Sequence, residues 1–431
     1  MPLRHSNPRL HGGCSRLTTS LPSGNLQASD LGKTMTANWA NQTMWTADNI
    51  YILRGMNDAA VDLIYLDPPF NSKTNYAAPL GSKAAGAAFK DTWSLSDIDA
   101  EWINLLEGKH PALQRVLLAA TSNSDKSYLA YMAVRLLEMK RILKPTGSIY
   151  LHCDPTMSHY LKLVMDAIFG KHSFRNEIIW HYRRWTGKSK RFQKLHDVLL
   201  FYSKTKEHSF NVQYDSYTEK SLARKQHYHT RIKDDDVYVT SIDKKGVRAG
   251  DVWQIPVLNS QSKERVGYPT QKPLPLLRRI IRASSNPDDT ILDPFCGCAT
   301  ACIAAEIEGR QWAGIDISSK AAELVQQRFL DDIGRVTFDG IVRTDIPKRT
   351  DLGKLPPYNC KPNQTRLYGE QAGYCAGCST HFELRHLEMD HIIARNKGGT
   401  DHIENLQLLC GNCNRVKGDR GMEYLRVKLQ L

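Results

Sequence analysis

Two short stretches of the chain combine a carboxylate with residues that shape a tight loop. In the first, Asp67, Pro68, Pro69 and Phe70 follow the apolar run Val61–Leu66. The prolines cannot continue a central strand, because they lack the N–H that a ladder needs. The Asp67 carboxylate and a carbonyl of the turn could accept both hydrogens of an exocyclic amino group, and the ring of Phe70 offers a stacking face. This stretch predicts a nucleobase site; a plain Asp-Pro turn is the alternative.

The second stretch, Asp293-Pro-Phe-Cys-Gly-Cys-Ala-Thr300, leads from an expected strand into an expected helix. Its small residues, Gly297 among them, would let the backbone approach a ligand closely. Asp316 lies nineteen residues after Gly297, and dinucleotide sites place an acid about 20 residues beyond their glycines to bind ribose hydroxyls. The spacing favours an adenosine ligand, and the lack of a GxGxxG pattern argues against a nicotinamide cofactor. A plain strand-to-helix turn is the alternative.

Four cysteines near the C-terminus form two CxxC pairs, Cys375 with Cys378 and Cys410 with Cys413. Because nothing in the chain indicates secretion, the pairs favour a metal site over disulfides. Four thiolates in this arrangement predict a closed, tetrahedral Zn²⁺ site of the structural kind, with free thiols as the alternative. In a small module the metal would supply much of the folding free energy.

The elements around the first two stretches alternate between strands and helices. Short apolar runs predict strands at residues 61–66, 148–152, 198–202, 290–292 and 311–315. Helical spacing predicts helices at residues 127–143, 156–169, 274–284, 300–308 and 319–329, and a turn is expected at residues 144–147. This alternation predicts an α/β fold with a mostly parallel sheet, which binds ligands at the carboxyl ends of its strands.

Composition divides the rest of the chain. Residues 1–41 are polar and lack any period, so a disordered leader is expected there, followed by an α/β domain over residues 42–338. A polar, His-rich insertion spans residues 204–262. A proline-rich linker is expected over residues 339–356, and a compact cysteine module over residues 357–431.

The charge of the chain indicates a polyanionic partner. The 431 residues carry a formal net charge of +13, and a hydrophobic content of 41% is ordinary for a globular protein. Residues 171–250 hold 18 Lys and Arg against 9 Asp and Glu, with Trp180, Tyr182, Trp185 and Phe192 interspersed. This region is either a solvated loop or a nucleic-acid groove with stacking side chains. No apolar run is long enough to predict a membrane partner.

Three motifs in one order, Asp67-Pro-Pro-Phe70, Gln271-Lys-Pro273 and Asp293-Pro-Phe-Cys-Gly297, resemble the beta class of DNA amino-methyltransferases over residues 42–338. The resemblance implies a seven-stranded Rossmann-like sheet, S-adenosylmethionine as methyl donor, double-stranded DNA as substrate and target recognition by residues 204–262. It implies that Asp67, Pro68, Pro69 and Phe70 hold a flipped base. The implied cofactor residues are Thr270, Lys272, Asp293, Phe295, Gly297 and Asp316.

The target atom is less well defined by these motifs. An Asp before Pro-Pro resembles adenine-N6 enzymes more than cytosine-N4 enzymes, which stay the alternative. Transfer to the carbon C5 of cytosine is disfavoured, because that reaction uses a thiol and the chain has no Pro-Cys dipeptide.

Residues 357–421 resemble the HNH endonucleases with a ββα-metal fold. The Asp390-His391 pair, Gly398-Gly399, Asn405 and Asn414 appear in order around the cysteine pairs. The resemblance implies His391 as general base toward water, Asn405 as the residue that orients its loop, and Asp390 with Asn414 as ligands of Mg²⁺ or another divalent ion. A zinc module that only binds DNA is the alternative.

Together these features predict a DNA methyltransferase fused to an HNH endonuclease, in a restriction–modification-like role. The expected location is the cytoplasm of a prokaryotic or phage host cell, and a homodimer is left open. A third possibility is a zinc-containing DNA-binding regulator without enzymatic activity, against which the intact loops at Asp67 and Gly297 argue.

Overall fold

The computed structural model describes residues 36–429 except 72–75, 79–81, 86–87, 90–109, 184–186, 189, 221–229, 234–235, 240–244, 260 and 335–339. No helix within these ranges is long and apolar enough to cross a membrane. The disordered leader expected up to residue 41 is too long, because its last residues pack onto the domain. The side-chain amide of Asn38 donates to the Gly55 carbonyl at 2.8 Å, and the rings of Trp39 and Trp45 lie 6.0 Å apart. Residues 1–35 lie outside the described residues.

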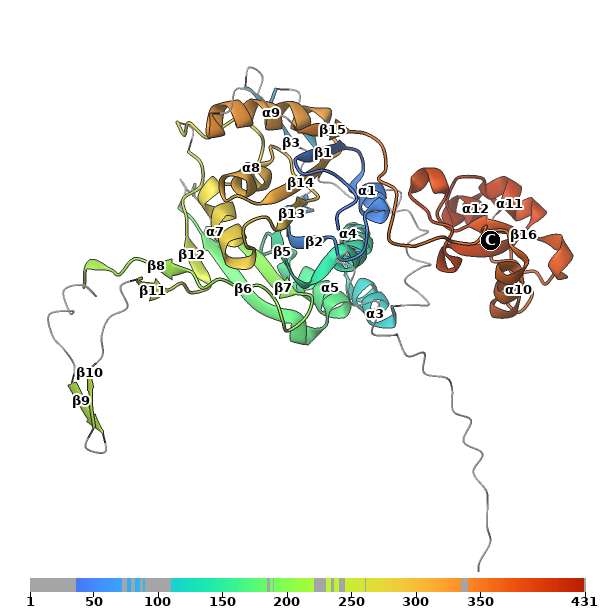
Figure 1. Ribbon diagram of the computed structural model, residues 1–431, viewed down its shortest axis with the longest axis horizontal. Coiled ribbons are helices and arrows are strands. Elements are labelled where there is room, and N and C mark those ends of the chain that lie inside the picture. Colours follow the sequence, from blue (N-terminus) through green and yellow to red (C-terminus); the bar gives the residue numbers. More distant parts are fainter. Residues whose placement is uncertain are drawn as a thin grey trace, which may run out of the picture. The chain divides into compact units, whose positions relative to one another are not determined.

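Nine of the described strands form one sheet in the order β12-β6-β7-β5-β2-β13-β14-β1-β15 (Figure 1). Neighbours are parallel except at β7, which is antiparallel to both β5 and β6. The strands are β1 (Thr43–Thr46), β2 (Val61–Leu66), β5 (Leu143–Cys153), β6 (Phe174–His181), β7 (His196–Ser203), β12 (Val252–Gln254), β13 (Thr290–Asp293), β14 (Gln311–Asp316) and β15 (Ile341–Arg343). The sheet has two strands more than the seven that the resemblance implies, and the short edge strands β12 and β15 account for the difference. Strand β15 lies within the segment expected as a linker.

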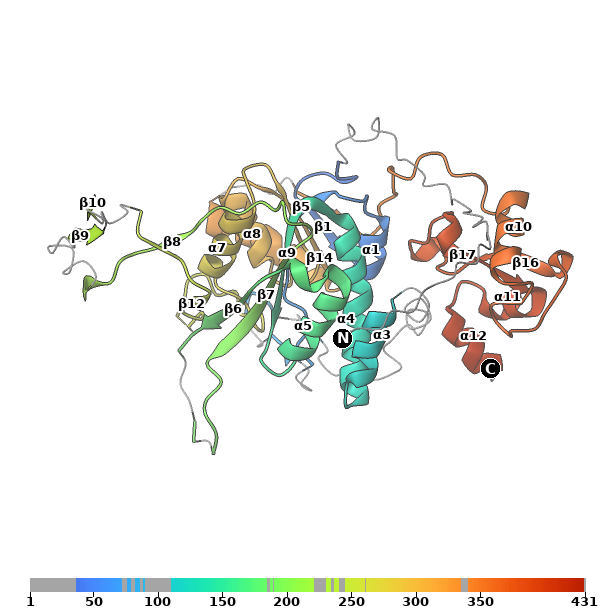
Figure 2. The same cartoon turned by 90° about the horizontal axis from the view of Figure 1, so that it is seen from below.

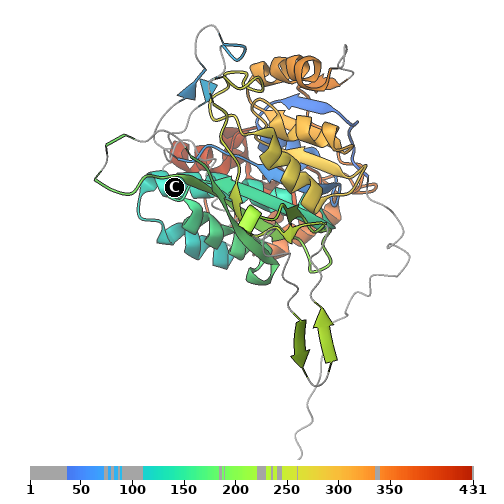
Figure 3. The same cartoon turned by 90° about the vertical axis from the view of Figure 1, so that its left-hand side faces the viewer.

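Helices cover both faces of this sheet, as the view along its edge shows (Figure 3). One face carries α1 (Asn49–Gly55), α3 (Pro111–Ala119), α4 (Asn123–Ile142) and α5 (Ser158–Phe169), with α4 and α5 side by side in Figure 2. The other carries α7 (Leu274–Ser284), α8 (Thr300–Ile307) and α9 (Ser319–Ile333). In β2, Ile64 and Leu66 pack in the first core, whereas Leu63 and Tyr65 pack in the second. A strand buried on both faces explains the unbroken apolar run there.

The chain reverses its direction across the sheet between β2 and β13. From β2 it continues to β5 on one side, and from β13 to β14 on the other. The pairs Ile291–Leu63 and Leu292–Ile64 set the register of the two strands. At such a reversal the loops after both strands diverge and leave a crevice at their carboxyl ends. Asp67 follows β2 and Asp293 ends β13, so the two motifs border the same crevice.

Several elements depart from the sequence-based expectations. Helix α7 has the predicted bounds, but α4 begins earlier, because the Ser122 side chain caps it by accepting from the Asp125 N–H at 3.1 Å. The turn expected at residues 144–147 lies within β5, where the register against β2 shifts. Strand β1, helix α1 and strand β6 were not predicted from the sequence.

The remaining strands form small antiparallel pairs. Within the insertion, β8 (Tyr214–Asp215) pairs with β11 (Val247–Arg248), and β9 (Thr230–Lys233) pairs with β10 (Asp236–Val239). Between β2 and α3, β3 (Tyr76–Ala77) pairs with β4 (Ala88–Phe89). Each of these pairs forms a two-stranded sheet that is not hydrogen-bonded to the nine-stranded sheet.

The C-terminal module has its own core and a ββα arrangement. Strand β16 (Leu387–His391) pairs antiparallel with β17 (Leu406–Cys410), and α11 (Gly411–Lys417) follows directly. Helices α10 (Lys361–Glu370) and α12 (Met422–Leu429) flank this unit. Its core is built from a few leucines and the cysteines, which is the expected composition of a module that depends on a metal.

Candidate active site and metal centre

A cavity of about 440 Å³ opens at the carboxyl ends of β1, β2, β13 and β14. Its volume is within the range of about 300–1,000 Å³ that holds small-molecule ligands. It brings together all the residues expected for the base and for the cofactor, namely Asp67, Pro68, Pro69, Phe70, Thr270, Lys272, Asp293, Phe295, Gly297 and Asp316. The two motifs therefore face one shared space rather than opposite sides of the sheet.

The carboxylate of Asp67 is the polar centre of this cavity. Its Oδ2 accepts a hydrogen bond from the Lys272 ammonium, which also donates to the Thr270 carbonyl at 3.2 Å. Its Oδ1 is buried and has no hydrogen-bond partner among the residues that the structure describes. A buried acceptor left without a donor costs about 1–3 kcal/mol, so this oxygen is set to accept a hydrogen from a ligand. Lys272, expected beside the cofactor, lines the shared cavity and contacts the carboxylate of the base motif.

A buried histidine behind Asp67 was not anticipated from the sequence. His152 is fully buried at the end of β5, and its Nδ1 lies 3.8 Å from Asp67 Oδ1 and 2.9 Å from the Tyr65 hydroxyl. Its Nε2 lies 3.3 Å from the Asp197 carboxylate. Burial raises the pKa of Asp197, but interactions with His152, Lys272 and Tyr182 together outweigh burial and hold this pKa below its usual range. The Phe70 and His152 rings lie 5.7 Å apart, so His152 supports both ends of the base motif.

The loop after β13 is held by the acid at the end of β14. The Gly297 N–H donates to Asp316 Oδ2, and the Ser318 N–H donates to Asp316 Oδ1, both at 2.8 Å. Gly297 has φ +51°, and a Cβ there would lie 2.9 Å from a ring carbon of Tyr268. The position therefore requires glycine. Burial raises the pKa of Asp316 and, more strongly, that of Asp293.

A further wall of the cavity comes from the loop after β1. The side-chain amide of Asn49 donates to the Pro294 carbonyl at 2.7 Å, and Arg135 donates to both Asn49 Oδ1 and Asp48 Oδ1 at 2.7 Å. The Arg135 guanidinium also lies 3.3 Å from the centre of the Tyr131 ring. Sequence reasoning missed Asp48 and Asn49 because β1, the strand before them, has only four residues.

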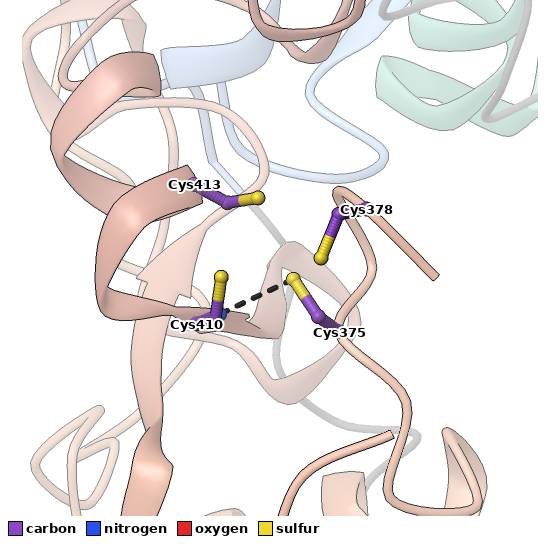
Figure 4. Close-up of side chains that lie close together, drawn as sticks. All are labelled: Cys375, Cys378, Cys410 and Cys413. Carbon is purple, nitrogen blue, oxygen red and sulfur yellow. Dashed lines mark hydrogen bonds between the residues drawn. The ribbon is translucent and has the colours of Figure 1, made fainter. Parts of the chain in front are cut away.

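The four paired cysteines converge in the C-terminal module (Figure 4). Their sulfurs all lie within 4.8 Å of one another. The N–H groups of Gly377 and Cys410 donate to Cys375 Sγ at 3.4 and 3.2 Å. Zn–S bonds of about 2.3 Å in a tetrahedron place sulfurs about 3.8 Å apart, so the four residues fit one metal ion.

The histidine of the Asp390-His391 pair is held from two sides. His391 Nε2 lies 2.8 Å from Asp401 Oδ1, and its ring lies 4.6 Å from that of Tyr358. Asn405 braces the loop that follows: its amide donates to the carbonyls of Ile393 and Thr400, and its Oδ1 accepts from the Ile393 N–H. The side chain of Asn405 therefore fixes the loop shape, which gives His391 a defined position.

The divalent-ion pair implied by the resemblance is not assembled by the described contacts. Asp390 accepts from the Gln407 side chain at 2.8 Å and lies 3.1 Å from the buried ammonium of Lys417. Asn414 donates to Glu388 Oε2 at 2.7 Å rather than facing Asp390. The positive charge of Lys417 occupies the place where a cation would meet Asp390, so these residues do not fit an ion in this arrangement.

The sequence pattern of a DNA methylase family matches residues 61–327, and that of the HNH endonucleases matches residues 375–420. The chain belongs to the DNA methylase family. This DNA methylase also carries an HNH endonuclease domain at its C-terminus.

Relatives of this methylase share modest identity over most of its length. The Type II methyltransferase M.EcaI of Enterobacter cloacae is 27% identical over 75% of this chain and 76% of its own length. The DNA adenine methyltransferase YhdJ of Escherichia coli K12 is 24% identical over 73% of this chain and 94% of its own. A solved structure, the cytosine-N4-specific PvuII DNA methyltransferase, is 17% identical with a TM-score of 0.42, over 68% of this chain and 88% of its own.

Replacing Asp293 by Asn is expected to stabilise the folded methylase at pH 8. Because burial raises the pKa of the Asp293 carboxyl, the folded state holds its proton more tightly than the unfolded state, and stability is lost as the pH rises through the folded pKa. Asn stays neutral and keeps an acceptor for the Phe295 N–H, which bonds Asp293 Oδ1 at 3.1 Å. Urea denaturation should show a gain on the order of 1 kcal/mol at pH 8 that shrinks toward pH 4.

The control is Asp345→Asn, which alters an exposed carboxylate. The hydrogen bond from Arg343 lowers the pKa of Asp345, so this variant should show no stabilisation at pH 8. A gain for Asp293→Asn that is the same at pH 4 and pH 8 would contradict the assignment to a raised pKa.

Proposed function

We propose that this methylase transfers a methyl group from S-adenosylmethionine to the N6 amino group of adenine at a specific site in double-stranded DNA. The observation that carries the proposal is Asp67 Oδ1, which accepts no hydrogen bond from the described part of the chain and lies in the cavity that also holds Asp293, Gly297 and Asp316. A site with one free carboxylate acceptor and an adjacent ring suits a planar base with an NH₂ group. Target reading by residues 204–262, and a C-terminal module that begins at residue 357, are part of this proposal.

The residues of the cavity divide into a base side and a cofactor side. When bound, S-adenosylmethionine supplies an electrophilic methyl group; Asp293, Phe295 and Gly297 would hold its methionine and adenine parts, and Asp316 its ribose. The cavity fits such a ligand because its walls offer the buried carboxylate of Asp293, the half-buried carboxylate of Asp316 and the glycine-containing loop after β13. These residues act by holding and orienting the donor.

On the base side, Asp67 Oδ1 accepts one amino hydrogen, and a carbonyl of the proline turn accepts the other. Both interactions draw the nitrogen lone pair out of conjugation with the ring, which makes it nucleophilic. Phe70 stacks on the base, and His152 with Lys272 keeps the Asp67 carboxylate in place. Catalysis is then largely a matter of aligning the nitrogen with the methyl group.

The choice of adenine rests on the acid in the first position of the Asp67–Phe70 motif. The relative YhdJ, named as a DNA adenine methyltransferase, supports the same choice, and the name of M.EcaI supports a restriction–modification role. Transfer to the N4 of cytosine is the alternative. Mass spectrometry of nucleosides from methylated DNA separates N6-methyladenine from N4-methylcytosine.

Asp67→Ala is expected to lower the rate of methyl transfer to duplex DNA by about 10²–10⁴-fold, because the amino group loses its acceptor. The measurement uses tritiated S-adenosylmethionine and DNA from a host that lacks this methylation. Asp345→Ala removes an exposed carboxylate outside the cavity and should leave the rate unchanged. Undiminished methyl transfer by Asp67→Ala would refute the assignment of the base site.

A second candidate function, DNA cleavage by the HNH domain, is supported by the His391–Asp401 pair, which could orient the imidazole toward water. With Mg²⁺ or Mn²⁺ added, the wild type should nick supercoiled plasmid and His391→Ala should not. His391→Ala should methylate DNA as well as the wild type does. If the wild type binds but never nicks the plasmid, the domain serves only to bind DNA, as the Lys417–Asp390 pair favours.

We also propose that the four-cysteine cluster holds a structural Zn²⁺ ion. Cys413→Ser should abolish zinc binding, whereas the wild type should contain about one ion per chain by elemental analysis. Cys360→Ser is the matched control, because Cys360 lies in the same module but outside the cluster. Zinc retained by Cys413→Ser, or lost from Cys360→Ser, would contradict the proposal.

A further inference from the structure

Phe192 is the most exposed large apolar side chain among the described residues, with a relative exposure of 101%. It lies in the loop of residues 182–195 that joins β6 to β7, of which 184–186 and 189 lie outside the described residues. No residue of the described ranges covers this phenyl ring, so it contributes nothing to their packing. Its place in the loop suggests that a binding partner covers it.

The loop leaves the sheet at the carboxyl ends of β2 and β5, which is the edge that carries Asp67. Strand β7 runs antiparallel to β5, so its first residues lie beside the last residues of β5: Val198 pairs with Cys153 and Leu199 with His152. Strand β5 is parallel to β2 and ends at the same edge. Residues 182–195 therefore start from the edge that carries the Asp67 carboxylate.

The ends of the loop are hydrogen-bonded to residues around His152 and Asp67. The Tyr182 N–H donates to the Leu195 carbonyl at 3.0 Å, and the Tyr182 hydroxyl donates to Asp197 at 3.1 Å. Asp197 is the partner of His152, which stands behind Asp67. The Lys194 ammonium also donates to Thr156 Oγ1 at 2.9 Å, in the turn after β5. These bonds hold the two ends of the loop, at Tyr182 and at Lys194–Leu195, at the sheet edge that carries Asp67.

The charge around Phe192 matches a nucleic acid. Residues 183–195 contain six Lys or Arg and no acid, and Lys188, Lys190, Arg191 and Lys194 are exposed. Basic side chains on a loop contact phosphates without regard to sequence. An apolar side chain among such contacts can enter between bases, as in proteins that unstack DNA with a phenylalanine or leucine wedge.

We propose that Phe192 inserts into the base stack of the duplex and fills the space that the target base leaves when it turns into the cavity. The inference rests on the proposed function, because it presupposes that the target base is everted. Eversion costs unstacking energy, and stacking of the Phe192 ring on the neighbouring bases offsets part of that cost. Phe192 is thus a positioning residue, which acts on the DNA rather than on the reacting atoms.

The kinetic test compares Phe192→Ala with Phe192→Trp on a duplex that contains one methylation site, located beforehand by sequencing of methylated DNA. Phe192→Ala should lower kcat/KM by about 10- to 100-fold on the paired duplex, because a stack on the neighbouring bases is lost. A mismatch at the target base weakens its pairing and should restore most of the rate. Phe192→Trp should stay within a few-fold of the wild type.

The matched control is Leu330→Ala, which removes a side chain with 42% exposure near the end of α9. It should not change the rate on either duplex. The proposed insertion of Phe192 would be overturned if Phe192→Ala kept the full rate on the paired duplex. It would also be overturned if Phe192→Ala lost the same rate on the paired and the mismatched duplex.

A fluorescence measurement separates the wedge from methyl transfer. When duplex is added, the indole introduced by Phe192→Trp should be quenched by stacking, beyond the change seen in the wild type, whereas that of Leu330→Trp should not. Fluorescence anisotropy of a labelled duplex shows whether the variant binds. If the variant binds but its indole at position 192 is not quenched, the proposed insertion of Phe192 is overturned. Quenching without methyl transfer by the wild type would contradict the proposed function but support insertion of residue 192.

Discussion

The pairing of β2 with β13, where the chain reverses its direction across the sheet, is the constraint on which the site depends. The register that sets Leu63 beside Ile291 brings the end of one strand level with the end of the other. Because the two chain paths then diverge, their loops leave a cavity between the Asp67 carboxylate and the Gly297 backbone. Segments more than 200 residues apart in the sequence thus face one ligand space without any direct bond between Asp67 and Gly297.

The polar groups in this cavity lower the stability of the folded protein, because burial removes them from water. Asp293 is buried and Asp316 is half-buried, burial raises the pKa of both carboxyls, and Asp67 Oδ1 has no hydrogen-bond donor within the described ranges. A protein selected for stability alone would place apolar or paired groups there, since an unpaired buried polar atom is destabilising. The backbone N–H bonds to Asp316 and the ammonium of Lys272 offset only part of this cost. The remaining polar groups are available to a ligand, which is what a binding site requires.

Much of the sheet and both loops could be predicted, because buried strands such as Val61–Leu66 have unbroken apolar runs and the loops contain proline or glycine. The contacts across the cavity could not be predicted from the sequence. The approach of Lys272 to Asp67, and of His152 to both Asp67 and Asp197, depends on how distant strands align. Strand β1 was missed because four residues give too little periodicity, and Asn49 was missed with it.

The C-terminal module fixes its polar groups by a different means, since its hairpin is short and its core is small. Cys410 ends β17 opposite Leu387, while His391 lies at the other end of the same hairpin opposite Leu406. Cys413 lies in α11, the helix that also carries Asn414 and the buried Lys417. The cysteine cluster therefore joins the hairpin that carries Asp390 to the helix whose lysine neutralises it. A metal bound there would hold the hairpin and the helix together, and with them the Lys417–Asp390 pair.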